Sequence, residues 1–328
     1  MPPADRPGLT DEEFLDSLYR EPAGVTELDP AFVAEAAAAL RNQAALPAGT
    51  DYEQVVRDMF NPVRDFRGPK VEMLRQAASR YLHPAEQTLL SLAMGFLHTQ
   101  ALNGCAVRAP SGGKVILMDK GVLLHMQLLG RCILALTTWS APAPFCRDHP
   151  PVAWFDAIVK LAQFANSMDP RFLQAITVWH CPSLEPWDLQ SAKFATQVEV
   201  FVLLHEYGHV ALGHLDPKRV ATRGRFVVFQ TDPAQEIEAD AFGMQRMIEA
   251  AEAGAAALVA ASFLRFVDLM EHLAHGGPVA TATHPAARER LARIKQSTGL
   301  DAEAHAVIAQ IESLFDVALR ATRPSGQQ

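Results

Sequence analysis

The chain has 328 residues, of which 49% are hydrophobic and 20% are charged, as in ordinary globular proteins. This length suits one large domain or two smaller ones, and it can bury a core without disulfide bonds or structural metal ions. The 37 acidic and 29 basic residues give a formal net charge of −8. This balance argues against nucleic-acid binding, because nucleic-acid-binding domains usually carry a basic face.

The sequence also argues against a membrane protein. Its longest apolar run, residues 254–264, is shorter than the roughly 20 residues of a membrane-spanning helix. The acidic, proline-bearing N-terminus has no basic stretch followed by an apolar one, so we expect no signal peptide. None of the four cysteines forms a Cys-x-x-Cys pair, which suits reduced thiols. We therefore expect a cytoplasmic protein without a membrane span.

The spacing of apolar and turn residues predicts a mostly helical chain with a small sheet. In chain order, helices are expected at residues 30–40, 71–82, 84–102, 121–136, 154–165, 189–212, 235–250, 255–273, 285–295 and 302–319. Short strands are expected at residues 114–118, 175–179 and 225–229, and a flexible tail at 323–328. The expected fold class is therefore α+β, mainly helical.

The long helix expected at residues 189–212 contains the pattern His205-Glu206-Tyr207-Gly208-His209. Residues four apart lie one turn apart on one helix face, so both imidazoles can bind one metal ion. Zinc with two histidines and one acidic ligand keeps a position open for water and lowers the pKa of that water to near 7. The Glu206 carboxylate is not a ligand, and we expect it to take the water's proton and pass it to the leaving amine.

A third zinc ligand is expected on the next helix. Glu236 and Asp240 are four residues apart and share a helix face, so Glu236 can bind the metal while Asp240 accepts a hydrogen bond from a ligating histidine. The same carboxylates also suit a solvated acidic helix start. Glu238 projects about 200° away from Glu236 and ranks second. His214 lies about 180° from His205 if the first helix continues, so we expect it to cap that helix instead.

These two helices together resemble the gluzincin zinc metallopeptidases. Residues 111–124 are similar to the strand-then-Gly-Leu-Leu segment of the HtpX and CAAX-prenyl-protease branch, and residues 283–291 to its Thr-His-Pro-x-x-x-x-Arg-Ile/Leu segment. The segments follow the family's order over residues 103–294. Residues 211–214 and 238–243 are similar to motifs of the ImmA/IrrE regulatory proteases, and the Lit-type phage-exclusion peptidases are a third candidate. The sequence leaves these branches open.

The resemblance implies a particular organisation of the chain. Residues 103–322 would form a zincin-like peptidase domain with an insert at about 131–190, and residues 1–102 a helical region packed on it. A peptide substrate would lie as an added strand beside a sheet edge, supplied by the strand at 114–118 or at 175–179.

The resemblance also implies the roles of single residues. One zinc ion would be bound by His205, His209 and Glu236, with Glu206 as the catalytic base. His284 either approaches the zinc, as an oxyanion donor or a fourth ligand, or belongs to a turn with Pro285 as the first helical residue.

Arg290 belongs to the same C-terminal segment as His284. It either pairs with a buried carboxylate, Asp240 or Glu238, or lies on the solvated surface.

We thus expect a soluble zinc-dependent endopeptidase that acts on a protein or peptide and is controlled by a regulatory protein partner. The alternatives are a regulatory or phage-defence protein of the ImmA/IrrE or Lit kind with a narrow substrate range, and a non-catalytic interaction protein stabilised by zinc. A structural zinc site needs no base beside an open position, so Glu206 favours the enzyme.

Overall fold

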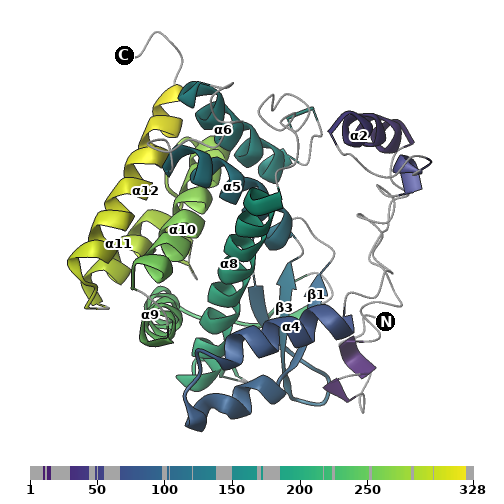
Figure 1. Ribbon diagram of the computed structural model, residues 1–328. Helices are drawn as coiled ribbons and strands as arrows, with labels where there is room; N and C mark the ends of the chain where they lie inside the picture. The colour runs from purple at the N-terminus through teal and green to yellow at the C-terminus, as the bar shows by residue number, and fades with distance from the viewer. Residues whose placement is uncertain are drawn as a thin grey trace.

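The computed structural model describes residues 10–11, 13–15, 30–43, 49, 51–54, 67–97, 102, 104–119, 121–137, 150–167, 171–172, 185–216, 218–223, 226–250, 253–281, 284–297 and 299–322. Within these ranges the chain is mainly helical with one small sheet, which confirms the predicted α+β class. The long helix α8 (Glu185–Ala211) runs through the middle of the molecule, between the sheet and the C-terminal helices (Figure 1).

Most helices lie within a few residues of their predicted positions. Besides α8 they are α2 (Pro30–Gln43), α4 (Arg67–Ser79), the 3-10 helix η2 (Pro84–Ser91), α5 (Gly121–Thr137), α6 (Pro151–Ser167), α9 (Pro233–Ala250), α10 (Ala253–His275), α11 (Ala287–Ser297) and α12 (Ala302–Ala321).

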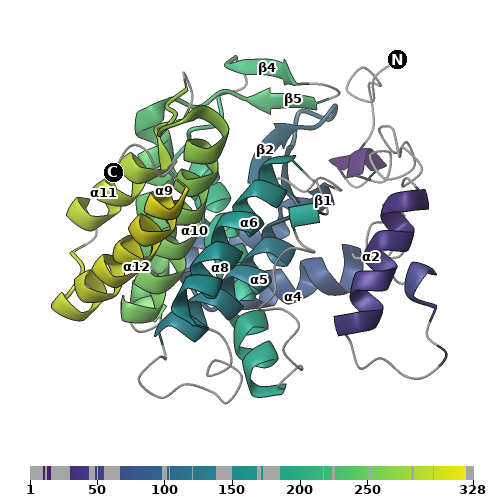
Figure 2. The same cartoon turned by 90° about the horizontal axis from the view of Figure 1, so that it is seen from above.

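The described part of the sheet has five strands in the order β1-β3-β2-β5-β4. These are β1 (Ala93–Leu97), β2 (Gly104–Arg108), β3 (Lys114–Asp119), β4 (Val220–Arg223) and β5 (Phe226–Phe229). β1 runs parallel to β3, and the other neighbouring pairs are antiparallel. β5 and β4 follow β2 at one end of the sheet (Figure 2).

The prediction of one helix over residues 84–102 was wrong. Helix η2 ends at Ser91, and the next residues form β1, in register with β3 from Ala93↔Val115 to Leu97↔Asp119. A short apolar run fits a helix and a buried strand equally well, so here the pairing partner decides. The sheet therefore takes one strand from the segment assigned to the N-terminal region. β2 and β4 were not predicted.

The expectation that residues 114–118 supply a sheet edge was also wrong. β3 pairs with β1 on one side and with β2 on the other, and five of its six residues are buried. A continuous apolar run such as Val-Ile-Leu-Met is typical of a strand covered on both faces. The other strand proposed as an edge, residues 175–179, lies outside the described residues.

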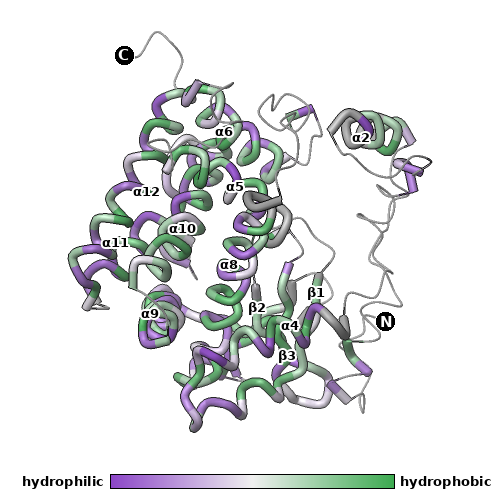
Figure 3. Tube along the Cα trace, viewed as in Figure 1, coloured by the Kyte–Doolittle hydropathy of each residue, from purple (hydrophilic) through white to green (hydrophobic). Residues whose placement is uncertain are grey.

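Each face of the sheet packs against a different part of the chain. Met94, Phe96, Ile116 and Met118 point into the main core, which they share with α5, α8 and α10. Side chains of the opposite face, Val107, Val115 and Leu117 among them, pack against Phe14 and Leu15. This alternation is the period of two expected for strands. The hydropathy colouring shows hydrophobic and hydrophilic residues alternating along the helices and strands (Figure 3).

Helix α10 is long and apolar enough, by length and composition, to cross a membrane. This is weak evidence for a span, because 67% of the apolar window is buried inside the structure, as in the core helix of a soluble protein. α10 also buries Arg265, which donates hydrogen bonds to Asp268 and Asp316.

The backbones of α8 and α9 come into near contact at two glycines. A Cβ at Gly208 would lie 3.2 Å from the Cα of Ala239 and 3.2 Å from the Cβ of Phe242. A Cβ at Gly243 would lie 3.3 Å from the backbone nitrogen of His205. Both contacts are tighter than ordinary van der Waals separation, so only glycine lets the two helices pack this closely.

We predict that Gly208→Ala destabilises the protein by about 1–3 kcal/mol, because the added methyl forces α8 and α9 apart. A loss of stability would be informative, because Gly→Ala in an unobstructed helix stabilises a protein by about 1 kcal/mol. Gly254→Ala in α10 is the matched control, because its Cβ would meet nothing closer than 3.6 Å. Urea unfolding with a metal chelator present measures both. A Gly208→Ala protein as stable as the wild type contradicts the packing argument.

Candidate metal centre

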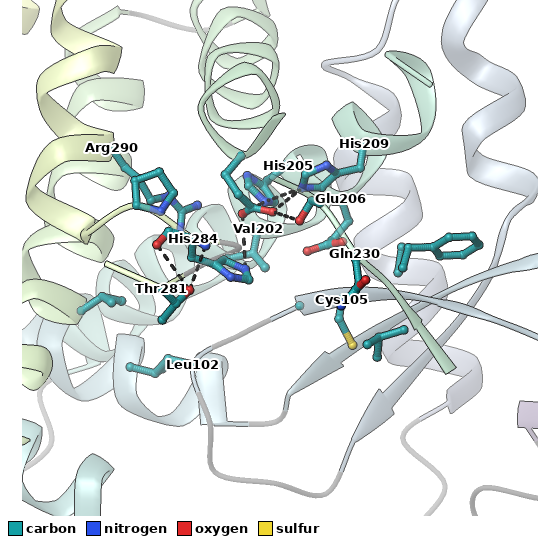
Figure 4. Close-up of a pocket in the computed structure, with 18 of the residues that line it drawn as sticks. Leu102, Cys105, Val202, His205, Glu206, His209, Gln230, Thr281, His284 and Arg290 are labelled. Carbon is teal, nitrogen blue, oxygen red and sulfur yellow. Dashed lines mark hydrogen bonds and ion pairs between the residues drawn. The ribbon is translucent and has the colours of Figure 1, made fainter. Parts of the chain in front are cut away.

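The centre of the site is a pair of imidazoles on α8. His205 and His209 are both buried, and their Nε2 atoms lie 3.1 Å apart (Figure 4). They lie one helical turn apart on one face, as the spacing predicts. Both rings thus point the same nitrogen at one point in space.

Glu236, in the first turn of α9, reaches both rings. Its Oε2 lies 3.5 Å from His205 Nε2 and its Oε1 lies 3.3 Å from His209 Nε2, while the Thr231 hydroxyl donates to Oε1 at 2.6 Å. Burial acts to raise the pKa of Glu236, but its contacts with the two imidazoles outweigh this and lower it well below the usual range. The carboxylate is therefore ionised.

These three residues form a group that fits a metal ion. One ligand atom from each of His205, His209 and Glu236 lies within 4.8 Å of the others, and all three residues are buried. Two imidazole nitrogens and one carboxylate oxygen are the donor set of many catalytic zinc sites. The sequence predicted these three residues as one ligand set, and the structure brings them together as a candidate metal site.

Asp240 orients the first imidazole. Its Oδ1 lies 2.9 Å from His205 Nδ1, on the ring edge opposite the metal-facing nitrogen. Burial acts to raise the pKa of Asp240, but Arg290 and His205 lower it to about 2. Burial likewise acts to lower the pKa of His205, but Asp240 and Glu236 raise it to about 10. The surroundings of this ring thus stabilise positive charge.

Arg290, from α11, makes two hydrogen bonds to Asp240, from Nε and Nη2, each 2.7 Å long. Of the two partners weighed from the sequence, Arg290 therefore pairs with Asp240 and not with Glu238. A paired guanidinium holds the Asp240 carboxylate in one orientation, and through it the imidazole of His205.

Glu206 lies between α8 and β2 and is 4% exposed. A Cβ at Gly104 of β2 would lie only 3.1 Å from Cγ and Oε1 of Glu206, and the backbone N–H of Ala106 donates to the carboxylate. Burial raises the pKa of Glu206 to about 7, and the nearby Glu236 adds to this effect. A carboxyl group with such a pKa can both accept and donate a proton near neutral pH.

His284 lies on the loop between α10 and α11 and lines the same pocket as His205 and Glu206 (Figure 4). Its Nε2 is 3.5 Å from Glu236 Oε2, and its side chain is 45% exposed. Burial lowers its pKa. Because α11 begins at Ala287, Pro285 is not the first helical residue, so the proposed helix-start turn does not form in that way. The loop is held at Thr281, which hydrogen-bonds the His284 backbone.

Sequence reasoning missed the contacts that the His214 ring makes. Helix α8 ends at Ala211, and Gly213 has a φ of +74°, which turns the chain back toward the helix. The buried His214 ring lies with its Nδ1 3.0 Å from His209 Nδ1 and its Nε2 3.0 Å from Glu238 Oε2. The predicted cap forms through the backbone, because the His214 N–H donates to the His209 carbonyl at 2.9 Å, whereas the two ring contacts were not predicted.

A cavity of about 620 Å3 opens onto the site. Glu206, His205, His209 and Glu236 lie on its wall, and β2 contributes residues 104–106. A further part of the wall is apolar and comes from Leu102, Phe201, Val202, Phe263 and Val267. The cavity thus combines the ionisable cluster, a strand backbone and an apolar surface.

Comparison with known proteins points in the same direction. The model of the family Peptidase U49, a Lit-type peptidase family, matches residues 190–311, from α8 into α12. The matched region contains every candidate metal ligand together with Glu206, His284 and Arg290. The match supports a peptidase, and hence a hydrolase. Searches of curated proteins and of solved structures found no match.

We predict that Arg290→Gln costs about 3–5 kcal/mol of stability near neutral pH, because it leaves the Asp240 carboxylate buried without its cationic partner. The Asp240 pKa lies below its ordinary value, so this stabilisation is fully present above about pH 4 and is lost as the pH falls through about 2. The difference between variant and wild type should therefore shrink in acid.

Urea unfolding near neutral pH and near pH 3 measures the stability difference between variant and wild type at each pH. Arg293→Gln, an exposed position on the same helix, is the control and should stay within about 0.5 kcal/mol of the wild type. An equal loss for the two variants would show that the Arg290–Asp240 pair does not carry this stability.

Proposed function

We propose that the protein is a zinc-dependent peptidase in which Glu206 acts as general base. The observation that carries the proposal is the convergence of His205, His209 and Glu236 beside a buried carboxylate that is not one of the three donors. The match of the same region to a peptidase family supports it. A protein or peptide substrate and a cytoplasmic location remain part of the proposal.

His205, His209 and Glu236 would hold the metal ion, which when bound would polarise the scissile carbonyl and acidify a water. Glu206 lines the same cavity and accepts the proton from the attacking water, for which a pKa of about 7 suits it. It then donates the proton to the leaving amine. His284, at the cavity wall, is placed to donate a hydrogen bond to the developing oxyanion.

We propose that the substrate backbone lies along residues 104–106 of β2. This segment lines the cavity beside Glu206, and the pairing of β2 with β5 is confined to Val107↔Val228. An extended peptide can add to such a strand through backbone hydrogen bonds. The position replaces β3, whose register covers all six of its residues between β1 and β2; β2 also has a neighbour on each side, but only its Val107 is in register with β5.

The site and the family match also help to choose among the alternative functions predicted from the sequence. A non-catalytic zinc site has no use for a carboxylate that is desolvated beside the donors and not among them. The Lit-type match favours the third of the related branches, and with it a narrow substrate range, over the HtpX and ImmA/IrrE branches.

We predict that Glu206→Gln keeps the fold and one bound zinc but lowers cleavage by about 10²–10⁴-fold, because the base is lost while the ligands stay. His205→Ala should lose the zinc. Newly formed protein N-termini in a bacterial lysate, compared between wild type and Glu206→Gln, identify the cleaved substrate. Metal analysis of the purified proteins gives the zinc content. Cleavage by Glu206→Gln at the wild-type rate rules out the mechanism, and stoichiometric zinc in His205→Ala rules out the ligand set.

We also predict that Gly104→Ala lowers the cleavage rate by up to about 10²-fold, because the added methyl displaces the Glu206 carboxylate. Zinc affinity should stay at the wild-type value, since the atoms nearest to the added methyl belong to Glu206 and Val202 and not to a proposed ligand. The rate on the substrate identified above is compared with that of Gly254→Ala, whose methyl has room. Weaker zinc binding with an unchanged rate would contradict the placement of Glu206 against β2.

A further inference from the structure

The mechanism above leaves one buried group near the metal site without a role. The His214 ring is 5% exposed and lies between His209 and Glu238, with its Nδ1 3.0 Å from His209 Nδ1 and its Nε2 3.0 Å from Glu238 Oε2. His214 is not one of the three residues whose donor atoms converge. Its ring touches the edge of His209 that faces away from that point.

The chain of contacts restricts where the protons can lie. An ionised carboxylate only accepts hydrogen bonds, so Glu238 requires a proton on His214 Nε2. A neutral imidazole carries one proton, which leaves His214 Nδ1 as an acceptor. The 3.0 Å contact between the two Nδ1 atoms then requires a proton on His209 Nδ1. His209 Nε2 is left with a free lone pair, which is the form that binds a metal.

We propose that His214 and Glu238 are positioning residues that fix the tautomer and orientation of His209. The proposal deepens the proposed function and rests on it. His205 has a matching arrangement, in which Asp240 accepts from Nδ1 and Arg290 holds Asp240. His214 and Glu238 orient His209 in the same way.

The two supports differ in their exposure. The Asp240 side chain is 1% exposed, whereas that of Glu238 is 62% exposed. Removing Glu238 takes away an exposed carboxylate and leaves His214 Nε2 without this partner, so we expect the variant to fold but its imidazole to lose its fixed tautomer. This makes Glu238 the decisive position for a test, while His214, being buried, carries the larger expected effect.

The test measures zinc affinity by competition with a chromophoric chelator. Because removal of partners of metal-ligating histidines typically costs 10–100-fold in affinity, we expect His214→Ala to weaken zinc binding by up to about 100-fold and Glu238→Ala by about 10-fold. His214→Asn should recover most of the loss, since its amide oxygen can accept from His209 Nδ1. The controls are His305→Ala and Glu303→Ala, both exposed positions on α12.

A second readout needs neither zinc nor activity. In protein labelled with ¹⁵N-histidine, the ring nitrogen spectra show which nitrogen carries the proton. We expect His214 protonated at Nε2 in the wild type and a mixture of tautomers for His209 in Glu238→Ala.

Each outcome decides the question. Folded Glu238→Ala and His214→Ala proteins that bind zinc within twofold of the wild type overturn the proposal, as does a His214 proton on Nδ1. Recovery by His214→Asn separates positioning from mere packing. A wild type that binds no zinc would instead remove the proposed function, while the ring spectra still test the proton arrangement.

Discussion

The site depends on the near contact between the backbones of α8 and α9. Gly208 and Gly243 contribute no side chain of their own at this contact, so α9 lies close against the helical turn that carries His205 and His209. The short side chain of Asp240 can then reach an imidazole on the neighbouring helix, and Glu236 can reach two. A larger separation would remove these contacts together, because the carboxylates are fixed to one rigid helix.

The second constraint is the charge that this packing buries. Glu206, Glu236 and Asp240 are each less than 5% exposed, and Arg290 is the cation bonded to Asp240. Buried carboxylates are costly unless they are paired or bind a metal. Here Arg290 offsets the charge of Asp240, and Glu236 faces two imidazoles, of which His205 has a pKa raised to about 10. The raised pKa of Glu206 lets the third carboxyl hold a proton near neutral pH. The arrangement thus suits a cation, either a proton on the His205 imidazole or a metal ion held by the three donor atoms.

Helical periodicity was enough to predict the main residues of the site. A spacing of four placed His205 with His209 and Glu236 with Asp240, and these are the groups that the structure brings together. The prediction missed the ring contacts of His214 with His209 and Glu238, because they depend on the chain reversal at the positive-φ Gly213. It also failed at β1, since an apolar run does not reveal whether a strand lies beside it. Pairing partners are non-local, and for that reason the interior position of β3 could not be read from its own residues.

The position of Glu238 shows how one helix can serve both imidazoles. Its projection of about 200° from Glu236 counted against it as a ligand, and the same angle directs it to the outer side of α9. The chain reversal at Gly213 brings His214 to the same side of α9, where its Nε2 contacts the Glu238 carboxylate. Three side chains within five residues of α9 therefore serve both rings. Glu236 contacts the Nε2 edge of each ring, and Asp240 contacts the opposite edge of His205. Glu238 reaches the opposite edge of His209 through His214. The two ligands differ in consequence: the support of His205 ends in a buried ion pair, and that of His209 ends at the surface. Because an exposed carboxylate holds its partner less firmly than a desolvated, bidentate pair does, we expect His209 to be held less rigidly than His205.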